Sequence, residues 1–425
     1  MHIYEHSVLL DESKCTGCTT CLRHCPTEAI RIKDGHAVIS SERCIDCGEC
    51  IRVCPQKAKK ATCGKLADIA AYKWKIALPA PTLYGQFDNL EDVDYVLDGL
   101  LKIGFDDVYE VSKAAELVSA YTRLYLKIDN IKKPVISSAC PVVVRLISLR
   151  FPSLAEHVIH MLPPMEIAAK LAKEKALAEH PEFSPEDIGV FFITPCPAKA
   201  SYVKNGFAGY KSAVDGVIPI NDIYFLLIGK MKNGEKIKQL SESGRIGIGW
   251  ARSGGEATAI FNDNYLAADG IDNVIHVLDQ MENDNMPHLE FIELNACTGG
   301  CVGGVLTIQN PFIAKARLQT LRRYLPVSLN LLSKEESNYI PEMYLFEDIP
   351  EYHHIQRLGS SIAESMRMMS DIQKLKNQLP GIDCGSCGAP TCRAFAEDVI
   401  KNQACLEDCP IKPFLEKKDK SGKKD

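Results

Sequence analysis

The chain has 425 residues, a formal net charge of -6 at pH 7 and 46% hydrophobic residues. This length suits about two to four domains, and the acidic balance argues against a nucleic-acid-binding protein. No apolar run approaches a membrane span, and the N-terminus lacks the apolar core of a secretory signal, so we expect a cytoplasmic protein without membrane insertion.

The 18 cysteines occur in groups that are separated by long cysteine-free stretches. In a reducing compartment, grouped cysteines indicate metal ligation before they indicate disulfides. Many such ligands also favour an anaerobic setting, because exposed iron-sulfur clusters oxidise.

The N-terminal region carries two copies of C-x2-C-x2-C-x3-C-P, at residues 15–26 and 44–55. This pattern is typical of bacterial two-cluster ferredoxins, in which the last cysteine of each copy serves the other copy's cluster. Zinc sites use pairs of C-x2-C instead, which disfavours a zinc ribbon. We therefore predict a ferredoxin-like (α+β) domain over residues 1–66, with a hairpin turn at Asp34 and Gly35. The predicted ligands are Cys15, Cys18, Cys21 and Cys54 for one 4Fe-4S cluster, and Cys44, Cys47, Cys50 and Cys25 for the other.

From Lys75 onward the pattern becomes α/β, and three cysteine loops directly follow predicted strands. The loops SSACP, TPCPAK and ELNACTGGCVGGVL together supply four thiolates, enough for one 4Fe-4S cluster. Four unrelated buried cysteines are the weaker alternative, because each cysteine lies in a Pro- or Gly-containing loop. The four are Cys140, Cys196, Cys297 and Cys301. Hydrophobic periodicity predicts helices at 90–101 and 166–180, and strands at 76–78, 188–194, 245–250 and 289–294.

The C-terminal part begins with a predicted linker and helix region over 331–375, whose long helix extends over 355–379. A separate motif follows, in which Cys384, Cys387 and Cys392 are spaced C-x2-C-x4-C. It resembles a 4Fe-4S module of electron-transfer and corrinoid-linked proteins from anaerobes, and we place this small helical module at 376–413. Cys409 is the predicted fourth ligand, and Cys405 is the competing one. The basic tail 414–425 is predicted to be disordered.

The three central loops resemble, in order and separation, the signature motifs of the iron-only (Fe-Fe) hydrogenases. The resemblance implies an α/β H-cluster domain over 67–330. Its H-cluster would be a 4Fe-4S cluster joined through one cysteine to a diiron unit with carbonyl, cyanide and a bridging dithiolate, in addition to three accessory 4Fe-4S clusters. By position, Cys140, Cys196 and Cys297 would be terminal ligands, Cys301 the bridge, and Lys199 the donor to a cyanide. The predicted cofactor-binding set also includes Pro79, Ala80 and Met165.

Residues beside the ligands depart from the family pattern. Ala139 replaces a proton-relay cysteine, and Tyr202 replaces a relay glutamate. Further differences are Asn295 and Thr194 in place of methionines, and Val142 in place of a tryptophan. We predict that residual proton transfer uses Glu256 and Glu293; the alternative is that both are solvated or capping glutamates.

An intact set of cluster ligands without the usual relay favours a hydrogenase of the sensory branch. It would bind H2 and oxidise it slowly and reversibly to protons, passing electrons to a redox or signalling partner protein, while maturation proteins would supply the diiron unit. One alternative is a metabolic, ferredoxin-linked hydrogenase. Another is a hydrogenase-like protein that handles iron-sulfur clusters and lacks the diiron unit.

Overall fold

The computed structural model describes residues 4–206, 210–231, 237–346 and 358–411. The chain divides into two compact units, one of residues 1–45, 49–60 and 353–425, and one of residues 46–48 and 61–352. The predicted basic tail, residues 414–425, lies outside the described residues, as does the predicted start of the long helix at 355–357. No helix in the described part of the chain is long and apolar enough to cross a membrane.

The larger unit is built on two parallel sheets, with strand orders β6-β5-β8-β9 and β10-β11-β7. Parallel strands require crossover connections, which usually cover both sheet faces with helices. β8 is accordingly buried at every position and has the bounds predicted for it. The strands are β5 (Trp74–Pro79), β6 (Asp107–Val108), β7 (Val135–Ile136), β8 (Ile188–Thr194), β9 (Gly216–Pro219), β10 (Tyr265–Asp269) and β11 (Phe291–Asn295).

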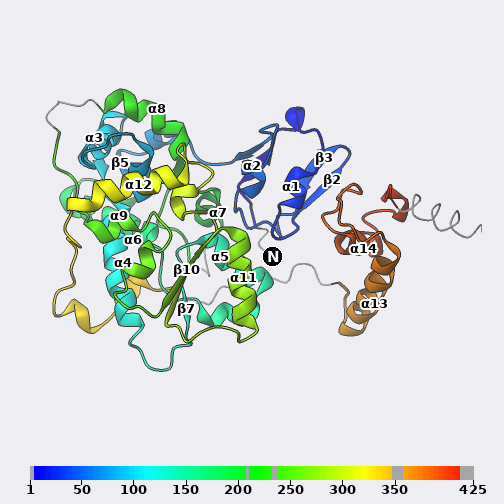
Figure 1. Ribbon diagram of the computed structural model, residues 1–425. Helices are drawn as coiled ribbons and strands as arrows, with labels where there is room; N and C mark the ends of the chain where they lie inside the picture. Colours follow the sequence, from blue (N-terminus) through cyan, green and yellow to red (C-terminus); the bar gives the residue numbers. More distant parts are fainter. Residues whose placement is uncertain (1–3, 207–209, 232–236, 347–357, 412–425) are drawn as a thin grey trace, which may run out of the picture. The chain divides into compact units, whose positions relative to one another are not determined.

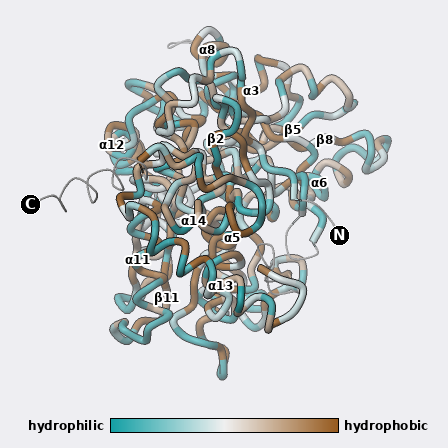
Figure 2. Tube along the Cα trace, turned by 90° about the vertical axis from the view of Figure 1, so that its right-hand side faces the viewer, coloured by the Kyte–Doolittle hydropathy of each residue, from teal (hydrophilic) through white to brown (hydrophobic). Residues whose placement is uncertain are grey.

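Helices pack around these sheets, and α4, α6 and α9 lie together in Figure 1. The mostly hydrophobic α5 is brown in Figure 2, and most of its side chains are buried. The α/β fold expected for this region is therefore confirmed. The helices are α3 (Asp94–Lys102), α4 (Val111–Tyr125), α5 (Pro141–Arg150), α6 (Pro164–Glu179), α7 (Pro197–Asn205), α8 (Ile220–Lys230), α9 (Arg245–Gly249), α10 (Gly255–Thr258), α11 (Ile271–Glu282) and α12 (Pro311–Leu321).

The prediction of a strand at 245–250 is wrong, because these residues form helix α9. The alternation in RIGIGW mimics a half-buried strand, but a carboxylate on α4 supplies the missing backbone partners. Glu116 Oε1 accepts hydrogen bonds from the Gly244 and Gly247 amides at 2.7 and 3.3 Å. A Cβ at Gly247 would collide with the Ser112 carbonyl, so the glycine permits this close packing.

In the smaller unit, strands β2 (Ile30–Lys33) and β3 (His36–Ile39) form the predicted antiparallel hairpin. Its turn residues Asp34 and Gly35 have φ angles of 50° and 77°, as a tight hairpin turn requires. Strands β1 (Val8–Leu10) and β4 (Lys59–Ala61) pair in a second small sheet. Short helices α1 (Thr20–Arg23) and α2 (Glu49–Arg52) carry cysteines of the two motifs.

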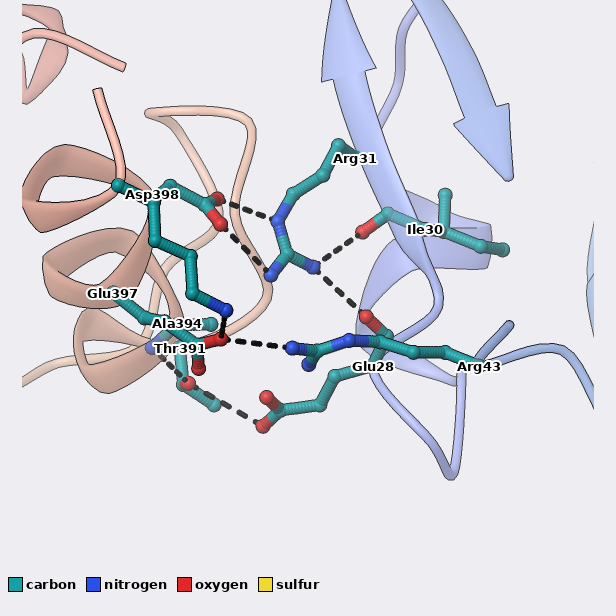
Figure 3. Close-up of polar contacts among 9 residues, drawn as sticks. Glu28, Ile30, Arg31, Arg43, Thr391, Ala394, Glu397 and Asp398 are labelled. Carbon is teal, nitrogen blue, oxygen red and sulfur yellow. Dashed lines mark hydrogen bonds and ion pairs between the residues drawn. The ribbon is translucent and has the colours of Figure 1, made fainter. Parts of the chain in front are cut away.

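The C-terminal helices α13 (Ile362–Gln378) and α14 (Cys392–Ile400) belong to this same unit. Figure 3 shows α14 joined to the β2 hairpin region by ion pairs. Arg31 binds both oxygens of Asp398 at 2.6 and 3.2 Å, and Arg43 binds Glu397 at 2.9 Å. The backbones also meet, since the Ile32 amide donates to the Gly388 carbonyl at 2.9 Å. The C-terminal module is therefore docked on the ferredoxin-like region.

Candidate metal centre

The three central cysteine loops begin where parallel strands end. Cys140 follows β7 and Cys297 follows β11, which is the neighbouring strand of the same sheet. Cys196 follows β8 of the other sheet. Carboxyl ends of parallel strands are the usual positions of sites in α/β folds, because the connecting loops gather there.

Local structure fixes the first two cysteines at the starts of helices. Cys140 is the N-cap of α5 and Cys196 is the N-cap of α7, and each is followed by a proline in the first helical turn. Proline suits this position because its missing N–H needs no intrahelical partner. The Thr194 hydroxyl oxygen accepts the Cys196 amide at 3.1 Å, which orients the second loop.

The third loop is compressed against its neighbours and needs its glycines. Gly300 has φ +91°, and Cβ atoms at Gly303 and Gly304 would collide with carbonyl oxygens of Thr298 and Pro195. These glycines allow the loop to fold tightly between Cys297 and the start of the short 3-10 helix Cys301–Gly303.

The thiols of three loops influence one another. Burial, followed by the nearby Cys140, raises the pKa of the Cys301 thiol to about 12 and that of Cys196 to about 11. Cys301 keeps part of its surface open to solvent, while the protein surrounds the thiol on its other sides. Thiolates that repel one another in this way are stabilised when a metal group shares their charge.

The donor set fits a 4Fe-4S cluster. Cys140, Cys196 and Cys301 influence one another across the three loops, and Cys297 lies four residues before Cys301 in the glycine loop. Together they supply the four thiolates that such a cluster needs. Whether Cys301 also bridges to a diiron unit stays a prediction.

Lys199 ties the second loop to the first. Its Nζ donates to the Ala139 carbonyl oxygen at 2.9 Å. Its charge lowers the pKa of both Cys196 and Cys301, against the stronger effect of burial. Tyr202, one turn further along α7, is 5% exposed, and its ring centre lies 5.9 Å from the Lys199 Nζ. The site therefore contains a cation at the position predicted for a cyanide donor.

Glu256 and Glu293 are both buried, at 7% and 3% exposure, so neither is a solvated surface glutamate. Glu293 does match the capping alternative, because it accepts amides in the first turn of α10. Glu293 accepts hydrogen bonds from the Gly254 and Ala257 amides at 3.0 and 2.8 Å, and from the Asn295 side chain at 2.7 Å. The Ser137 hydroxyl donates to Glu256 at 2.7 Å. Burial and the neighbouring Glu293 charge raise the pKa of Glu256 to about 8. Burial raises the pKa of Glu293 as well, but its three hydrogen-bond donors oppose this rise, so Glu256 is the member of the pair that holds a proton at neutral pH.

The remaining predicted cofactor-binding residues are buried near strand and helix ends. Pro79 ends β5 beside Ile193 of β8, and Ala80 is 4% exposed. Met165 lies in the first turn of α6 and is 2% exposed. Their roles stay predictions.

The first set of ferredoxin-type cysteines lines one cavity in the smaller unit. Its wall contains Cys15, Cys18, Cys21 and Cys54, the four residues predicted to hold the first cluster. Of the second set, Cys44, Cys50 and Cys25 lie in the same unit, whereas Cys47 belongs to residues 46–48, which group with the larger unit.

The predicted cluster ligands of the C-terminal module also line a cavity. One cavity is lined by Cys384, Cys387, Cys392 and Cys409. Cys409 is 6% exposed, whereas Cys405 is exposed and does not line this cavity. The geometry therefore favours Cys409 as the fourth ligand.

Sequence reasoning missed three positioning residues. Ser137 and Asn295 hold the two glutamates, and Asp269 anchors the third loop by accepting the Gly299 amide at 2.9 Å. Asp269 ends β10, next to β11, so a correct strand order would have pointed to it. Nothing in the local pattern marks Ser137 as the partner of a residue 119 positions away.

Comparison with known proteins identifies three matching regions. A family model described as iron only hydrogenase large subunit, C-terminal domain, matches residues 73–305. A 4Fe-4S dicluster domain matches residues 7–55, and an Fe-S cluster model matches residues 379–411.

Individual relatives agree with these models. The periplasmic Fe hydrogenase large subunit of Nitratidesulfovibrio vulgaris is 25% identical over 372 residues, covering 70% of this chain and 86% of that protein. A solved structure from a study of stepwise FeFe-hydrogenase H-cluster assembly has a TM-score of 0.52 at 16% identity, covering 68% of this chain and 98% of the other. A variant of the Chlamydomonas reinhardtii FeFe-hydrogenase gives the same values. These structural matches show a shared fold.

The family model spans more than half of the chain, and it contains all three cysteine loops that converge in the structure. The chain therefore belongs to the iron-only hydrogenase large-subunit family and is an iron-sulfur protein with a hydrogenase H-cluster domain.

Proposed function

We propose that the protein binds H2 and oxidises it slowly and reversibly, 2H⁺ + 2e⁻ ⇌ H2, as a hydrogen or redox sensor. The observation that carries this proposal is the complete set of four cysteines and Lys199 beside two residues, Ala139 and Tyr202, that replace the family's proton relay. A bound H-cluster would supply the cleavage of H2 and take up its electrons. Cys140, Cys196, Cys297 and Cys301 would hold it.

The protein's own contribution to proton transfer would start at the first loop. The Ala139 amide donates to the Ser137 hydroxyl oxygen at 3.1 Å, and that hydroxyl donates to Glu256. Glu256 keeps its proton at neutral pH, and Glu293 is its more strongly hydrogen-bonded neighbour. Together they form a buried polar path that begins two residues from the missing relay cysteine. Loss of a well-positioned acid-base group typically slows catalysis about a hundredfold to ten-thousandfold, which suits detection better than throughput.

Electrons would move through the accessory clusters. Asp46 and Gly48 flank the ligand Cys47 and are held within the larger unit, where the Ser201 hydroxyl donates to Asp46 at 2.7 Å. Gly48 also lies against Val305, a residue of the third cysteine loop. Cys47, a predicted cluster ligand, therefore lies in a segment that belongs to the larger unit. The signalling or redox partner would exchange electrons with the other accessory clusters.

The test is to mature the protein with its diiron unit, record infrared spectra and measure H2 uptake. We expect carbonyl and cyanide bands together with low turnover. Absent bands would leave the cluster-handling alternative, and turnover equal to that of fast hydrogenases would favour the metabolic one.

The proton path is tested separately by Glu256→Gln and Glu293→Gln. Each is expected to lower H2 oxidation by at least about tenfold while the infrared bands remain. Glu179→Gln, at an exposed position on α6, is the matched control. Unchanged rates in both site variants would exclude this path.

A further inference from the structure

The cavity of the first predicted ferredoxin cluster contains a residue that no cluster motif requires. Lys59 lines it together with Cys15, Cys18, Cys21 and Cys54. The side chain is 3% exposed, and its Nζ has no hydrogen-bond partner among the described residues. An isolated buried ammonium is strongly disfavoured unless an opposite charge compensates for it. The charges available at this cavity wall are the thiolates of the four cysteines.

The strand that carries Lys59 shows that its burial is specific. Along β4, Lys59 is buried, and the adjacent Lys60 is exposed. Successive side chains of a strand point to opposite faces. Lys59 therefore faces the cluster cavity, whereas Lys60 carries the same charge into solvent.

The two copies of the ferredoxin-type motif can be compared with each other. Ala29 and Ala58, at matching positions of the two motifs, donate their amides to Cys25 and Cys54 sulfurs at 3.2 and 3.3 Å. The next residue is Ile30 in the first copy, 2% exposed, but Lys59 in the second. The two motifs therefore share the amide-to-sulfur bond and differ in one buried charge.

We propose that Lys59 sets the reduction potential of the cluster held by Cys15, Cys18, Cys21 and Cys54, making it the higher-potential member of the ferredoxin-type pair. A cluster with four thiolates is anionic and gains one more negative charge on reduction. A fixed buried cation stabilises the reduced form more than the oxidised form, because their charges differ.

The position of this cluster suggests what its higher reduction potential could do. Ile32 lines the same cavity, and its backbone is bonded to Gly388, one residue beyond the C-terminal ligand Cys387. The Lys59-tuned cluster would therefore collect and retain electrons next to the docked C-terminal module. The inference goes beyond the proposed function and does not depend on the diiron unit.

The test uses the full-length chain loaded only with 4Fe-4S clusters, in redox titrations followed by electron paramagnetic resonance. In Lys59→Met, one midpoint potential is expected to fall. The ratio of reduced to oxidised cluster at the wild-type midpoint should drop about tenfold, which corresponds to about 59 mV for a one-electron couple. Lys59→Arg keeps the charge and should titrate like wild type, and Lys60→Met is the matched surface control. The shift should be absent when Lys59→Met is made in a Cys18→Ser background that lacks this cluster.

Superimposable titrations of wild type and Lys59→Met, at equal iron content, would overturn the proposal, as would an equal shift in Lys60→Met. If Lys59→Met loses the cluster while Lys59→Arg and Lys60→Met retain it, the charge is needed for binding itself, which also supports compensation. Loss in both Lys59 variants would assign the residue a packing role and reject the proposal.

Discussion

The carboxylates of Glu256 and Glu293 differ in how many hydrogen bonds they accept, and this decides which one holds a proton. Glu293 accepts three and Glu256 accepts one. Hydrogen bonds to a carboxylate stabilise its charged form, whereas burial opposes it. Two chemically identical side chains therefore acquire different roles from their surroundings.

The raised pKa of Glu256 predicts a pH-dependent stability. The folded protein keeps this proton up to about pH 8, whereas the unfolded chain loses it near the ordinary value of 4.5. The folded state binds more protons between these values, so stability should fall as pH rises through this range. Glu256→Gln removes the contribution of this group, and its denaturant midpoint relative to wild type should be higher at pH 9 than at pH 5. A difference that does not change with pH would contradict this, and Glu179→Gln serves as the control.

Two neighbouring cysteines give a second prediction at this scale. Cys409→Ser should lose the C-terminal cluster, because Cys409 is buried in the wall that the other three ligands line. Cys405→Ser should retain it, because Cys405 is exposed. Iron and sulfide content, together with electron paramagnetic resonance, distinguishes the variants. The reverse pattern would make Cys405 the ligand.

At the scale of elements, helix α14 and strand β2 are joined by the bidentate pair of Arg31 and Asp398. The two side chains are 16% and 13% exposed, so water screens the pair less than it would a surface pair. Hydrogen bonds to charged groups typically contribute about 1.5–3 kcal/mol each. The contact therefore gives the module a specific orientation on the hairpin.

We expect Arg31→Asp to loosen this docking by about 1–3 kcal/mol, since it leaves two carboxylates facing each other. Hydrogen exchange of the Ile32 amide, which is bonded to Gly388, reports the change directly. The double variant Arg31→Asp with Asp398→Arg should restore protection. Arg52→Asp, whose partner Glu49 lies on the same short helix, is the control and should leave this amide unaffected. Equal exchange in all variants would mean that the ion pair does not hold the module.

At the scale of the whole molecule, the two compact units have separate interiors. In the larger one, buried Glu116 holds two distant segments, accepting amides of Gly244 and Gly247 and of Leu329 and Asn330. In the smaller one, the C-terminal module packs with the ferredoxin-like region. Multidomain chains of this kind do not unfold in one two-state step.

Calorimetry should therefore resolve two transitions. Glu116→Ala should lower the free energy of unfolding of the larger unit by at least about 3 kcal/mol, because several buried amides lose their acceptor. Arg31→Asp should lower the midpoint temperature of the smaller unit's transition only. Glu116→Gln preserves the shape and one acceptor oxygen, so its effect should be smaller. One transition that both substitutions shift equally would show that the units unfold together.

Much of this protein was readable from its sequence, because cluster ligation depends on cysteine spacing within short segments. The two ferredoxin-type motifs, the hairpin at Asp34 and Gly35, and strand β8 all follow from local pattern. The three central loops could be grouped because each follows an apolar strand. Where a distant residue supplied the deciding contact, local pattern failed, and residues 245–250 became a helix held by Glu116.

The sequence by itself determined the family, the cysteine sets and the α/β class, since these depend on residue type and on spacing along the chain. Only the tertiary structure decided which groups share an environment. It joined Ser137 to Glu256, favoured Cys409 over Cys405, docked the C-terminal module on β2, and buried Lys59 among four cysteines. Burial and charge proximity are set by residues far apart in the chain, and they determine where protons and electrons are held.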